Sequence, residues 1–534
     1  MVAVAAGILA GCAGGKGGKL EAEDLSITAG PETQVTTTYG TIEGFLDGGI
    51  YTFRGIPYAK SERFMEPQDP DRFEGVRMCK LYGPKAPQAE NLLWRDEASQ
   101  TDYTFGNNFV MEPMDEKGCQ VLNVWTPSIK DGKKRPVFVW IHGGGYASGS
   151  GHDLPCYEGR SLAKKGDIVV VNLNHRLNVL GYLDLSAYGG KYANSVNLGM
   201  KDIIKALEWV HKNIDRFGGD PAQVTIGGQS GGGGKVSTLL AMPAAKGLFQ
   251  RAVVQSGSAF DLSVPAKSQK YAAAVLEALG LNAASIDKIQ DCSYEQLAQA
   301  SRVATAKMAT ILGPQPRRFT MPGAEPVVDG KSIVQQPYDA VSPDVSKDVP
   351  LLVGTNFNEF SFAVQAGQSR EDVLAQLRAK MGENTDAYVA AFEKAFPGAE
   401  PYKMLYHEAF FRKGAVAHAT AKCRKEGGAK VWLYLFNWWP EVNALGASHG
   451  MELPFMFNNV SLQREMTGGE ARAYKLQEAI SDAWLAFIKT GDPNTPALPA
   501  WEAYNEKDAP TMVFEDKSRL VRHLDDNLLP LMAE

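Results

Sequence analysis

The sequence predicts an α/β fold, with a large, mostly parallel central sheet and helices on both faces. Two observations carry this prediction: short apolar runs recur along the chain, and segments with helical periodicity separate them. Strands that alternate with helices in this way form a mostly parallel sheet. The expected strands lie at residues 121–125, 137–141, 168–172, 224–227, 251–255, 350–353 and 431–436.

Two further elements stand out by their patterns. Residues 36–58 alternate in polarity and contain Gly48-Gly49, which is typical of a hairpin. A helix is expected over about residues 200–216. Its apolar residues recur at helical spacing, at Ile203, Ile204, Leu207, Val210 and Ile214.

One catalytic domain is expected to span residues 33–534. A chain of 534 residues averages three or four domains by length alone, but the motifs described below are spread over nearly all of it. Hydrophobic residues make up 44% of the chain, enough for an ample core. Two helix-rich regions, at about residues 260–345 and 365–430, are expected to cap the sheet over the active site.

A nucleophile motif follows the strand expected at residues 224–227. The pentapeptide Gly228-Gln229-Ser230-Gly231-Gly232 comes before a helix-like segment, as in the nucleophile elbow of the α/β-hydrolase fold. The turn exposes the serine Oγ. Glycines are needed at 228 and 232 because a Cβ there would collide with the neighbouring strand or helix. We therefore expect an α/β-hydrolase fold with Ser230 as the nucleophile.

A serine nucleophile needs a base and an acid that orients the base. In this fold the acid and then the histidine follow the serine along the chain. Glu359 lies in the polar loop after the strand expected at 350–353, at the sheet edge where catalytic groups gather. His449 lies downstream in a loop-like context. Glu359 and His449 are therefore the predicted acid and base, with Glu325 and Asp329 as alternative acids.

Backbone donors for an oxyanion are expected from two places. The strand expected at 137–141 runs into His142 and three consecutive glycines, which let N–H groups turn inward. The second source is the N–H of Gly231, at the positive end of the following helix. Ser256 and Ser258 are expected to support the site by hydrogen bonding. This chemistry needs no metal and no cofactor.

In this order, the motifs resemble those of the type-B carboxylesterases, a family that includes bacterial p-nitrobenzyl esterases, cholinesterases and bile-salt lipases. Matching segments lie at residues 53–59, 119–127, 142–146, 197–202, 217–221, 255–259, 326–330, 449–454 and 490–494. The resemblance implies a serine-type carboxylic-ester hydrolase that forms an acyl-enzyme intermediate, with a triad of Ser230, Glu359 and His449. It also implies an oxyanion hole formed by the N–H groups of Gly144, Gly145 and Gly231.

The chain departs from this family at three places near the site. Gln229 replaces the glutamate that cholinesterases carry before the nucleophile, so a negative charge for a cationic substrate is missing. Gly231 replaces the family's usual alanine. Residues 60–64 form a shorter segment than the family's loop, which borders the active-site mouth in relatives.

The partner expected from the sequence is a small-molecule ester. A net charge of −6 argues against a nucleic-acid partner, for which a basic face would be expected. No long amphipathic lid pattern is present, which favours small to medium organic esters over lipid esters. A lipase therefore stays as one alternative, and a non-catalytic adhesion module as another.

The first 32 residues are expected to lie outside the catalytic domain. Residues 2–11 form an apolar run that ends at Cys12 and resembles a bacterial lipobox, although the positive n-region of a signal peptide is missing. Lipidation of Cys12 would tether an exported protein to a membrane, at the cell surface or in the periplasm. The alternative is a fortuitous run of small residues and a cytoplasmic protein. No other apolar stretch is long enough to span a membrane.

The six cysteines leave their pairing open. Secreted relatives pair a cysteine equivalent to Cys119 with one near residue 86, which is Ala86 here. Cys79 lies seven residues earlier and is the one candidate replacement. Buried free thiols are the favoured interpretation.

Overall fold

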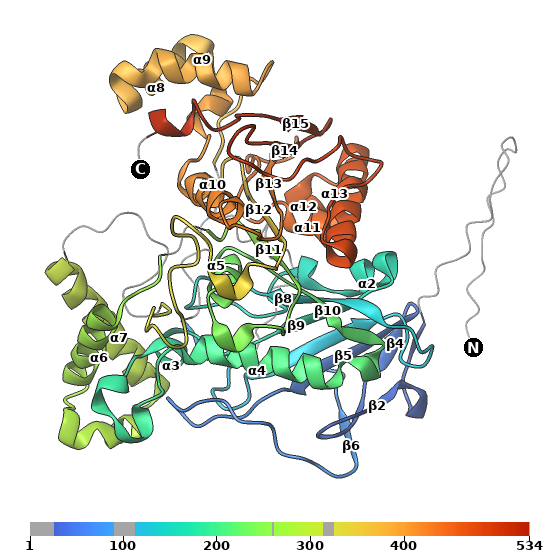
Figure 1. The fold of residues 1–534 in the computed structure, drawn as a ribbon, viewed down its shortest axis with the longest axis vertical. Coiled ribbons are helices and arrows are strands. Elements are labelled where there is room, and N and C mark those ends of the chain that lie inside the picture. The colour runs from blue at the N-terminus through green and yellow to red at the C-terminus, as the bar shows by residue number, and fades with distance from the viewer. Residues whose placement is uncertain (1–25, 90–112, 259–260, 313–324, 362, 533–534) are drawn as a thin grey trace, which may run out of the picture.

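A computed structural model describes residues 26–89, 113–258, 261–312, 325–361 and 363–532 (Figure 1). Within them, twelve strands form one sheet in the order β1-β4-β5-β7-β9-β8-β10-β11-β12-β13-β14-β15. The strands of this sheet are β1 (Ile27–Thr28), β4 (Phe45–Asp47), β5 (Ile50–Pro57), β7 (Val121–Thr126), β8 (Arg135–Ile141), β9 (Val169–Leu173), β10 (Gly219–Gln229), β11 (Arg251–Gln255), β12 (Leu351–Asn356), β13 (Val431–Phe436), β14 (Thr511–Phe514) and β15 (Arg519–Val521).

The centre of this sheet is parallel, as the alternation of strands and helices predicts. Strands β9, β8, β10, β11, β12, β13 and β14 pair in parallel, whereas the strands at both ends pair antiparallel. All seven strands expected from apolar runs are present. The carboxyl ends of the parallel strands therefore meet along one edge, where loops can gather side chains from distant parts of the chain.

The N-terminal region forms two hairpins rather than the one expected. The hairpin around Gly48-Gly49 joins β4 to β5, and both glycines have positive φ, 56° and 83°. A second hairpin joins β2 (Gln34–Thr37) to β3 (Gly40–Glu43). It belongs to a separate three-stranded sheet completed by β6 (Val76–Met78). The sequence prediction missed this hairpin because it treated the alternating residues from 36 onward as one pair of strands.

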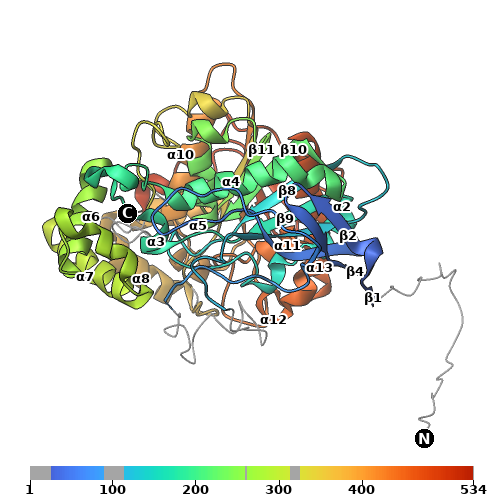
Figure 2. The same ribbon diagram turned by 90° about the horizontal axis from the view of Figure 1, so that it is seen from below.

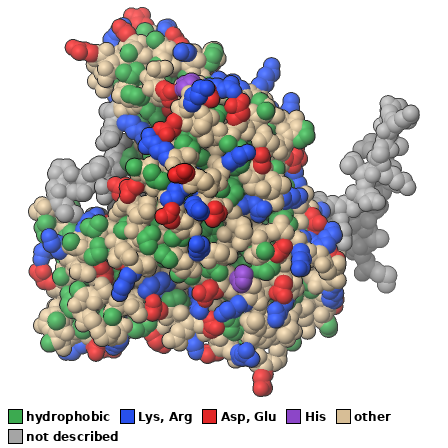
Figure 3. Space-filling view, viewed as in Figure 1, with side chains coloured by type: hydrophobic (Ala, Val, Ile, Leu, Met, Phe, Trp, Pro, Cys, Tyr) green, Lys and Arg blue, Asp and Glu red, His purple; other side chains and the backbone are tan. Residues whose placement is uncertain are grey.

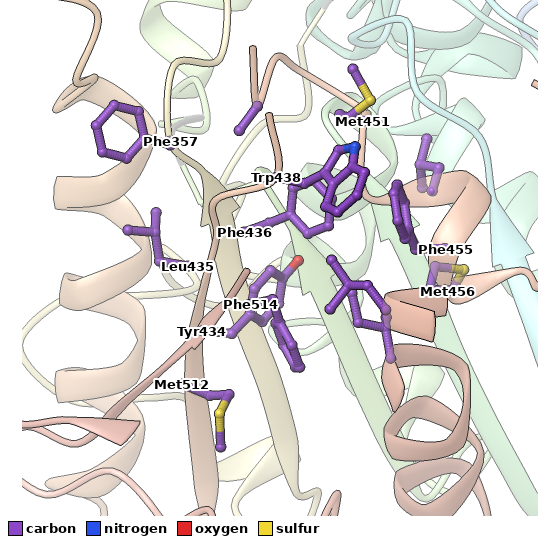
Figure 4. Packing of buried hydrophobic residues seen from close by; sticks show 14 of the residues in the cluster. Phe357, Tyr434, Leu435, Phe436, Trp438, Met451, Phe455, Met456, Met512 and Phe514 are labelled. Atoms are coloured by element: carbon purple, nitrogen blue, oxygen red, sulfur yellow. The ribbon is translucent and has the colours of Figure 1, made fainter. Parts of the chain in front are cut away.

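The sheet is buried on both faces. In β8, Phe138 and Trp140 pack into one hydrophobic cluster, and Val137 and Val139 pack into another. Successive strand residues point to opposite faces, so the two clusters lie on the two sides of the sheet. Figure 4 shows the first cluster around β13 and β14, where the aromatic side chain of Phe436 lies close to that of Phe455.

Helices cover both clusters. Helices α4 (Leu198–Asn213), α5 (Gly231–Leu239) and α10 (Phe410–Cys423) pack on the face that contains Val137. Helices α2 (Arg160–Gly166), α11 (Leu453–Met456) and α13 (Ala471–Thr490) pack on the opposite face. The helix expected at about 200–216 is α4, which begins two residues earlier and ends in a 3₁₀ turn at Ile214–Phe217.

Both regions expected to be rich in helix contain helices. The first contains α6 (Pro265–Ala278) and α7 (Tyr294–Leu312), which pack together at one flank of the molecule in Figures 1 and 2. The second contains α8 (Arg370–Met381), α9 (Thr385–Ala395) and α10. Helix α10 lies against β12 and β13, so it belongs to the layer that covers the sheet. That the two regions cap the active site stays a prediction.

The visible surface carries charges of both signs, and the cysteines of the described residues are free thiols. On the face shown in Figure 3, basic and acidic side chains are interspersed. Cys79 and Cys119 are both buried free thiols, and Ala86 packs against Cys119, where relatives are expected to carry a disulfide. No helix among the described residues is long and apolar enough to cross a membrane. Cys12 lies outside the described residues.

Candidate active site

Ser230 sits between the end of β10 and the start of α5, in a strained backbone conformation. Its φ is 58° and its ψ is −128°, values that a residue with a side chain rarely adopts and that cost on the order of 1–3 kcal/mol. Its N–H donates to Gln255 O on the neighbouring strand at 2.8 Å, and its carbonyl accepts from the N–H of Gly234 at 2.9 Å. These two bonds hold the turn between the strand and the helix.

The glycines around Ser230 are required by close backbone contacts, as the sequence predicts. A Cβ on Gly228 would lie closer than 3.0 Å to the backbone of Gly232, in α5. A Cβ on Gly232 would lie as close to the carbonyl of Ile141, at the end of β8. The helix and the two strands can therefore approach each other only because these positions lack side chains.

Glu359 and His449 lie in contact, although they are 90 residues apart. His449 Nδ1 is 2.5 Å from Glu359 Oε2, and the backbone N–H of His449 donates to Glu359 O at 2.8 Å. An ionised carboxylate can only accept hydrogen bonds, so Nδ1 is assigned as the donor. The neutral ring then has its acceptor lone pair on Nε2.

Two other donors hold the Glu359 carboxylate. Its Oε1 accepts from Ser256 Oγ at 2.7 Å and from the N–H of Asn356 at 2.9 Å. Ser256 thus supports the site as expected. The side chain of Ser258 instead bonds His418 Nδ1 at 2.9 Å. Glu359 is fully buried. Both oxygens of its carboxylate therefore require hydrogen-bond donors from the protein, and the structure supplies them.

The residues next to Ser230 and His449 in the sequence lie close to each other in the structure. A Cβ on Gly450 would lie 3.8 Å from Gln229 Nε2, so the loop that carries His449 runs beside the elbow. His449 Nε2 is buried and has no hydrogen-bond partner among the described residues, and none of their hydrogen bonds joins it to Ser230 Oγ. Such bonds are often long without substrate.

Two phenyl rings lie against the imidazole of His449. The ring of Phe360 stacks on it at a centroid distance of 4.3 Å, and the ring of Phe411, from α10, lies 5.2 Å away. Phe360 remains 37% exposed. A partly exposed aromatic ring beside the predicted base offers an apolar surface to a bound molecule. Neither phenylalanine was predictable as a site residue, because nothing local in the sequence brings Phe411 to residue 449.

The glycine loop after β8 packs against the elbow. Gly144 and Gly145 have φ of 80° and 63°, and neither N–H donates to a partner among the described residues. A Cβ on Gly231 would lie closer than 3.0 Å to the backbone of Gly145. Gly231 is the first residue of α5, where N–H groups have no partner within the helix. The three N–H groups are thus carried by two backbone segments in close contact.

A second buried carboxylate lies in the same network. Glu452 accepts from Asn356 Nδ2 at 2.6 Å and from Gln255 Nε2 at 3.1 Å. Burial, and next the charge of Glu359, raise the pKa of Glu452 to about 7. In the sequence, Glu452 stands out only as part of the matching segment at residues 449–454. Its position three residues after His449 was the available signal.

The alternative acids take other partners. Glu325 pairs with Lys267 Nζ at 2.7 Å. Asp329 accepts from the N–H groups of Lys331 and Ser332 at 2.9 and 2.8 Å. Among the described residues neither bonds His449, so Glu359 is the carboxylate that contacts this ring.

Comparison with known proteins relates this arrangement to one family. The family model described as "Carboxylesterase family" matches residues 31–529. A para-nitrobenzyl esterase of Bacillus subtilis is 34% identical over 494 residues, covering 90% of this chain and 95% of that protein. A phenmedipham hydrolase of Pseudarthrobacter oxydans is 32% identical over 505 residues, covering 90% and 94%.

Solved structures agree with the sequence comparison. An esterase from Clostridium hathewayi, described as able to hydrolyse aliphatic aromatic polyesters, superposes with a TM-score of 0.85. It is 34% identical, and the match covers 95% of this chain and 99% of that one. A structure described as a PNB esterase has a TM-score of 0.75 and 31% identity, with 94% and 100% covered.

Proposed function

Because the chain belongs to the carboxylesterase family and is a carboxylic-ester hydrolase with an α/β-hydrolase fold, we propose that it cleaves small to medium organic esters through a Ser230–His449–Glu359 triad. One observation carries the proposal. The Glu359 carboxylate fixes His449 Nδ1 at 2.5 Å. In the loop beside the Ser230 elbow this leaves a buried Nε2 that has no hydrogen-bond partner in the described part of the chain.

The first half of the reaction acylates the enzyme. His449 Nε2 takes the proton of Ser230 Oγ as this oxygen attacks the ester carbonyl carbon. Glu359 holds the ring in the required tautomer and stabilises the imidazolium that forms. The carbon–oxygen bond to the alcohol then breaks, and the alcohol leaves with the proton from Nε2. Ser230 carries the acyl group as an ester.

The second half releases the acid. A water molecule loses its proton to His449 Nε2 and attacks the acyl carbonyl carbon. Ser230 leaves with that proton, which restores the free enzyme. In both halves the oxyanion is bound by the N–H groups of Gly144, Gly145 and Gly231. Each donor of this kind is typically worth about 3 kcal/mol.

The proposed substrates have a moderately sized alcohol or acyl group. Two relatives are named for aromatic esters, a para-nitrobenzyl esterase and an esterase of aliphatic aromatic polyesters. The partly exposed side chain of Phe360 beside His449 supports an aromatic or apolar leaving group. Esters of long-chain fatty acids are the alternative, and the adhesion hypothesis is set aside because the chain is an enzyme.

Two measurements test this proposal. A fluorophosphonate probe is expected to label the purified protein at Ser230, as detected by peptide mass spectrometry. A series of p-nitrophenyl esters is expected to give the highest kcat/KM at short to medium acyl chains. A maximum at chains of twelve carbons or more would favour the lipase, and absence of labelling would contradict the triad.

The contact between Gly231 and Gly145 gives a sharp prediction about the oxyanion hole. The substitution Gly231→Ala introduces the family's usual residue, but its methyl group would overlap the Gly145 backbone. The loop must move, so we expect kcat for p-nitrophenyl acetate to fall by about 10- to 100-fold with little change in KM. An unchanged kcat would show that the loop accommodates the methyl group. Thermal unfolding of both proteins separates this effect from a loss of fold.

The location of the protein is a separate proposal. We propose that Cys12 is lipidated and tethers an exported protein to a bacterial membrane. Expression in a bacterium with an alkyne analogue of palmitate is expected to label the protein, and Cys12→Ser is expected to remove the label. A soluble, unlabelled protein in the cytoplasmic fraction would favour the alternative.

A further inference from the structure

A fully buried lysine lies behind the oxyanion loop. Lys235 belongs to α5, five residues after Ser230, and none of its side chain is exposed. Helical side chains lean toward the N-terminus of their helix, which directs this one at the loop after β8. Its Nζ donates to His142 O at 3.0 Å and to Gly143 O at 3.4 Å.

The glycines that open α5 make this contact possible. A Cβ on Gly232 would lie 2.8 Å from His142 O and closer still to Ile141 O, so the helix and the loop carbonyls are in direct backbone contact. Lys235 therefore reaches these carbonyls from within the helix. The role of this lysine does not follow from the sequence motif alone.

The position of Lys235 is energetically unfavourable for a cation. A helix N-terminus carries a partial positive charge, which repels an ammonium group. Burial adds a desolvation cost, and it lowers the pKa of Lys235 to about 7, although the charge of Asp153 opposes this shift. Placement at such a cost calls for a compensating role of the charge.

The surroundings of Lys235 contain several titratable groups. Nearby are His142 in the oxyanion loop and His175 after β9, whose rings stack at 5.0 Å, and Asp153. The ring of Tyr146 lies 6.0 Å from Nζ. Burial, and next the charge of Lys235, lower the pKa of both histidines well below the usual range. The histidines therefore stay neutral near pH 7.

Peptide geometry links Lys235 to the oxyanion hole. The C=O and N–H of a trans peptide point in opposite directions. The carbonyl of Gly143 shares its peptide group with the N–H of Gly144. The same oxygen lies 2.9 Å from His142 Nδ1. A cation bound there helps to fix the peptide plane, with the N–H directed away from the lysine. It also withdraws charge from the peptide group and makes the N–H a stronger donor.

We propose that Lys235 is a positioning residue for ester hydrolysis, whose ammonium group fixes and polarises the oxyanion loop through the carbonyls of His142 and Gly143. The proposal rests on the proposed function, because it takes the N–H of Gly144 as an oxyanion donor. The positive charge also favours a negative charge on the far side of the loop. The effect is larger in the transition state than in the substrate complex, because the oxyanion forms only there.

A second buried lysine provides a matched control. Lys422, near the end of α10, is 3% exposed, and its Nζ donates to Ser346 O at 2.8 Å and to Lys347 O at 2.9 Å. Burial lowers the pKa of Lys422 to about 8. Both lysines thus bind two consecutive carbonyls, but Lys422 holds a loop that contains none of the predicted site residues.

The test compares Lys235→Met with Lys422→Met in the full-length protein. We expect Lys235→Met to lower kcat for p-nitrophenyl acetate by about 10- to 100-fold, with KM changed less than threefold. The affinity for phenylboronic acid, which forms a negatively charged tetrahedral adduct with the serine, should fall by a similar factor. Lys422→Met should leave both values within twofold. Lys235→Gln keeps an N–H donor without the charge and should lie between Lys235→Met and the wild type.

A pH profile distinguishes this role from simple packing. The ammonium group is lost as the pH rises through about 7, so kcat of the wild type should decline on the alkaline side. Lys235→Met should lack this decline, because methionine does not titrate. An alkaline decline that persists in Lys235→Met would overturn the proposal.

Other outcomes are equally informative. The proposal would also be overturned if either Lys235 variant kept the wild-type kcat and boronate affinity. It would equally be overturned if Lys422→Met lost as much kcat and affinity as Lys235→Met. Fluorophosphonate labelling distinguishes failure of the proposed function from failure of the role of Lys235. A wild-type protein that is not labelled contradicts the proposed function itself. A labelled protein with an unaffected Lys235→Met variant contradicts only the role of Lys235. If Lys235→Met does not fold, Lys235→Gln provides the same comparison.

Discussion

Ser230→Ala is expected to lower kcat for p-nitrophenyl acetate by about 10⁴- to 10⁶-fold, because the proposed acyl-enzyme forms on the hydroxyl that this substitution removes. Any residual rate would come from the oxyanion donors acting on an attacking water molecule. The measurement is initial-rate kinetics on protein purified away from host esterases. Labelling by the fluorophosphonate probe should disappear in parallel.

A serine in the same helix provides the control for this prediction. Ser237 is also buried in α5, and its Oγ donates to Gly233 O at 2.9 Å, an ordinary bond within the helix. Ser237→Ala should retain kcat within about twofold, since such bonds contribute roughly 1 kcal/mol to stability. Activity of Ser230→Ala within tenfold of the wild type would refute the nucleophile.

Glu359→Gln is expected to lower kcat by about 10³- to 10⁴-fold, for a reason visible in the hydrogen bonds. Oε1 of Glu359 accepts from Ser256 Oγ and the Asn356 N–H, so the amide oxygen of glutamine must take that place. The amide NH₂ then faces His449 Nδ1, which becomes an acceptor. The ring proton moves to Nε2, where it blocks removal of the serine proton.

Glu452→Gln is the matched control for the acid. This second buried carboxylate shares Asn356 with Glu359 as a hydrogen-bond partner, but among the described residues its hydrogen bonds are to Asn356 and Gln255 and not to the ring of His449. Burial, and next the charge of Glu359, raise its pKa to about 7, so its charged form is less favoured than that of an ordinary carboxyl group. Replacement by a neutral amide should therefore cost less than about tenfold at pH 7. Equal losses in both variants would show that the network acts only by holding the loop.

The parallel sheet was predictable from the sequence because its strands are buried on both faces. Continuous apolar runs such as 137–141 and 431–436 leave few alternatives to a central strand. Strand β10 begins at Gly219, five residues before the expected start. The segment from Asp220 to Gln223 contains two polar residues and a proline, so the apolar pattern does not reveal this extension. The last two strands of the sheet, β14 and β15, were not expected because both are short, and the edge strand β15 is only partly buried.

The candidate site was predictable where the chemistry fixes an order along the chain. The rule that the acid and the histidine follow the serine led to Glu359 and His449, which are hydrogen-bonded in the structure. Lys235 and Phe411 could not be found in this way. Their relation to the site depends on which face of a helix meets which loop, and this is decided by tertiary packing rather than by local sequence.

Three neighbouring strands are followed closely by residues with unfavourable backbone geometry. Ser230, Ser256 and Glu359 follow β10, β11 and β12, with φ of 58°, 44° and 34°. Glycine would adopt these angles without a steric penalty, yet it would delete the hydroxyl or carboxylate that each position presents. Selection of variants for heat resistance would therefore favour glycine at the very positions proposed to react with the ester or to orient the base. Engineering for heat resistance should leave the carboxyl ends of these strands unchanged and place stabilising substitutions near their amino ends.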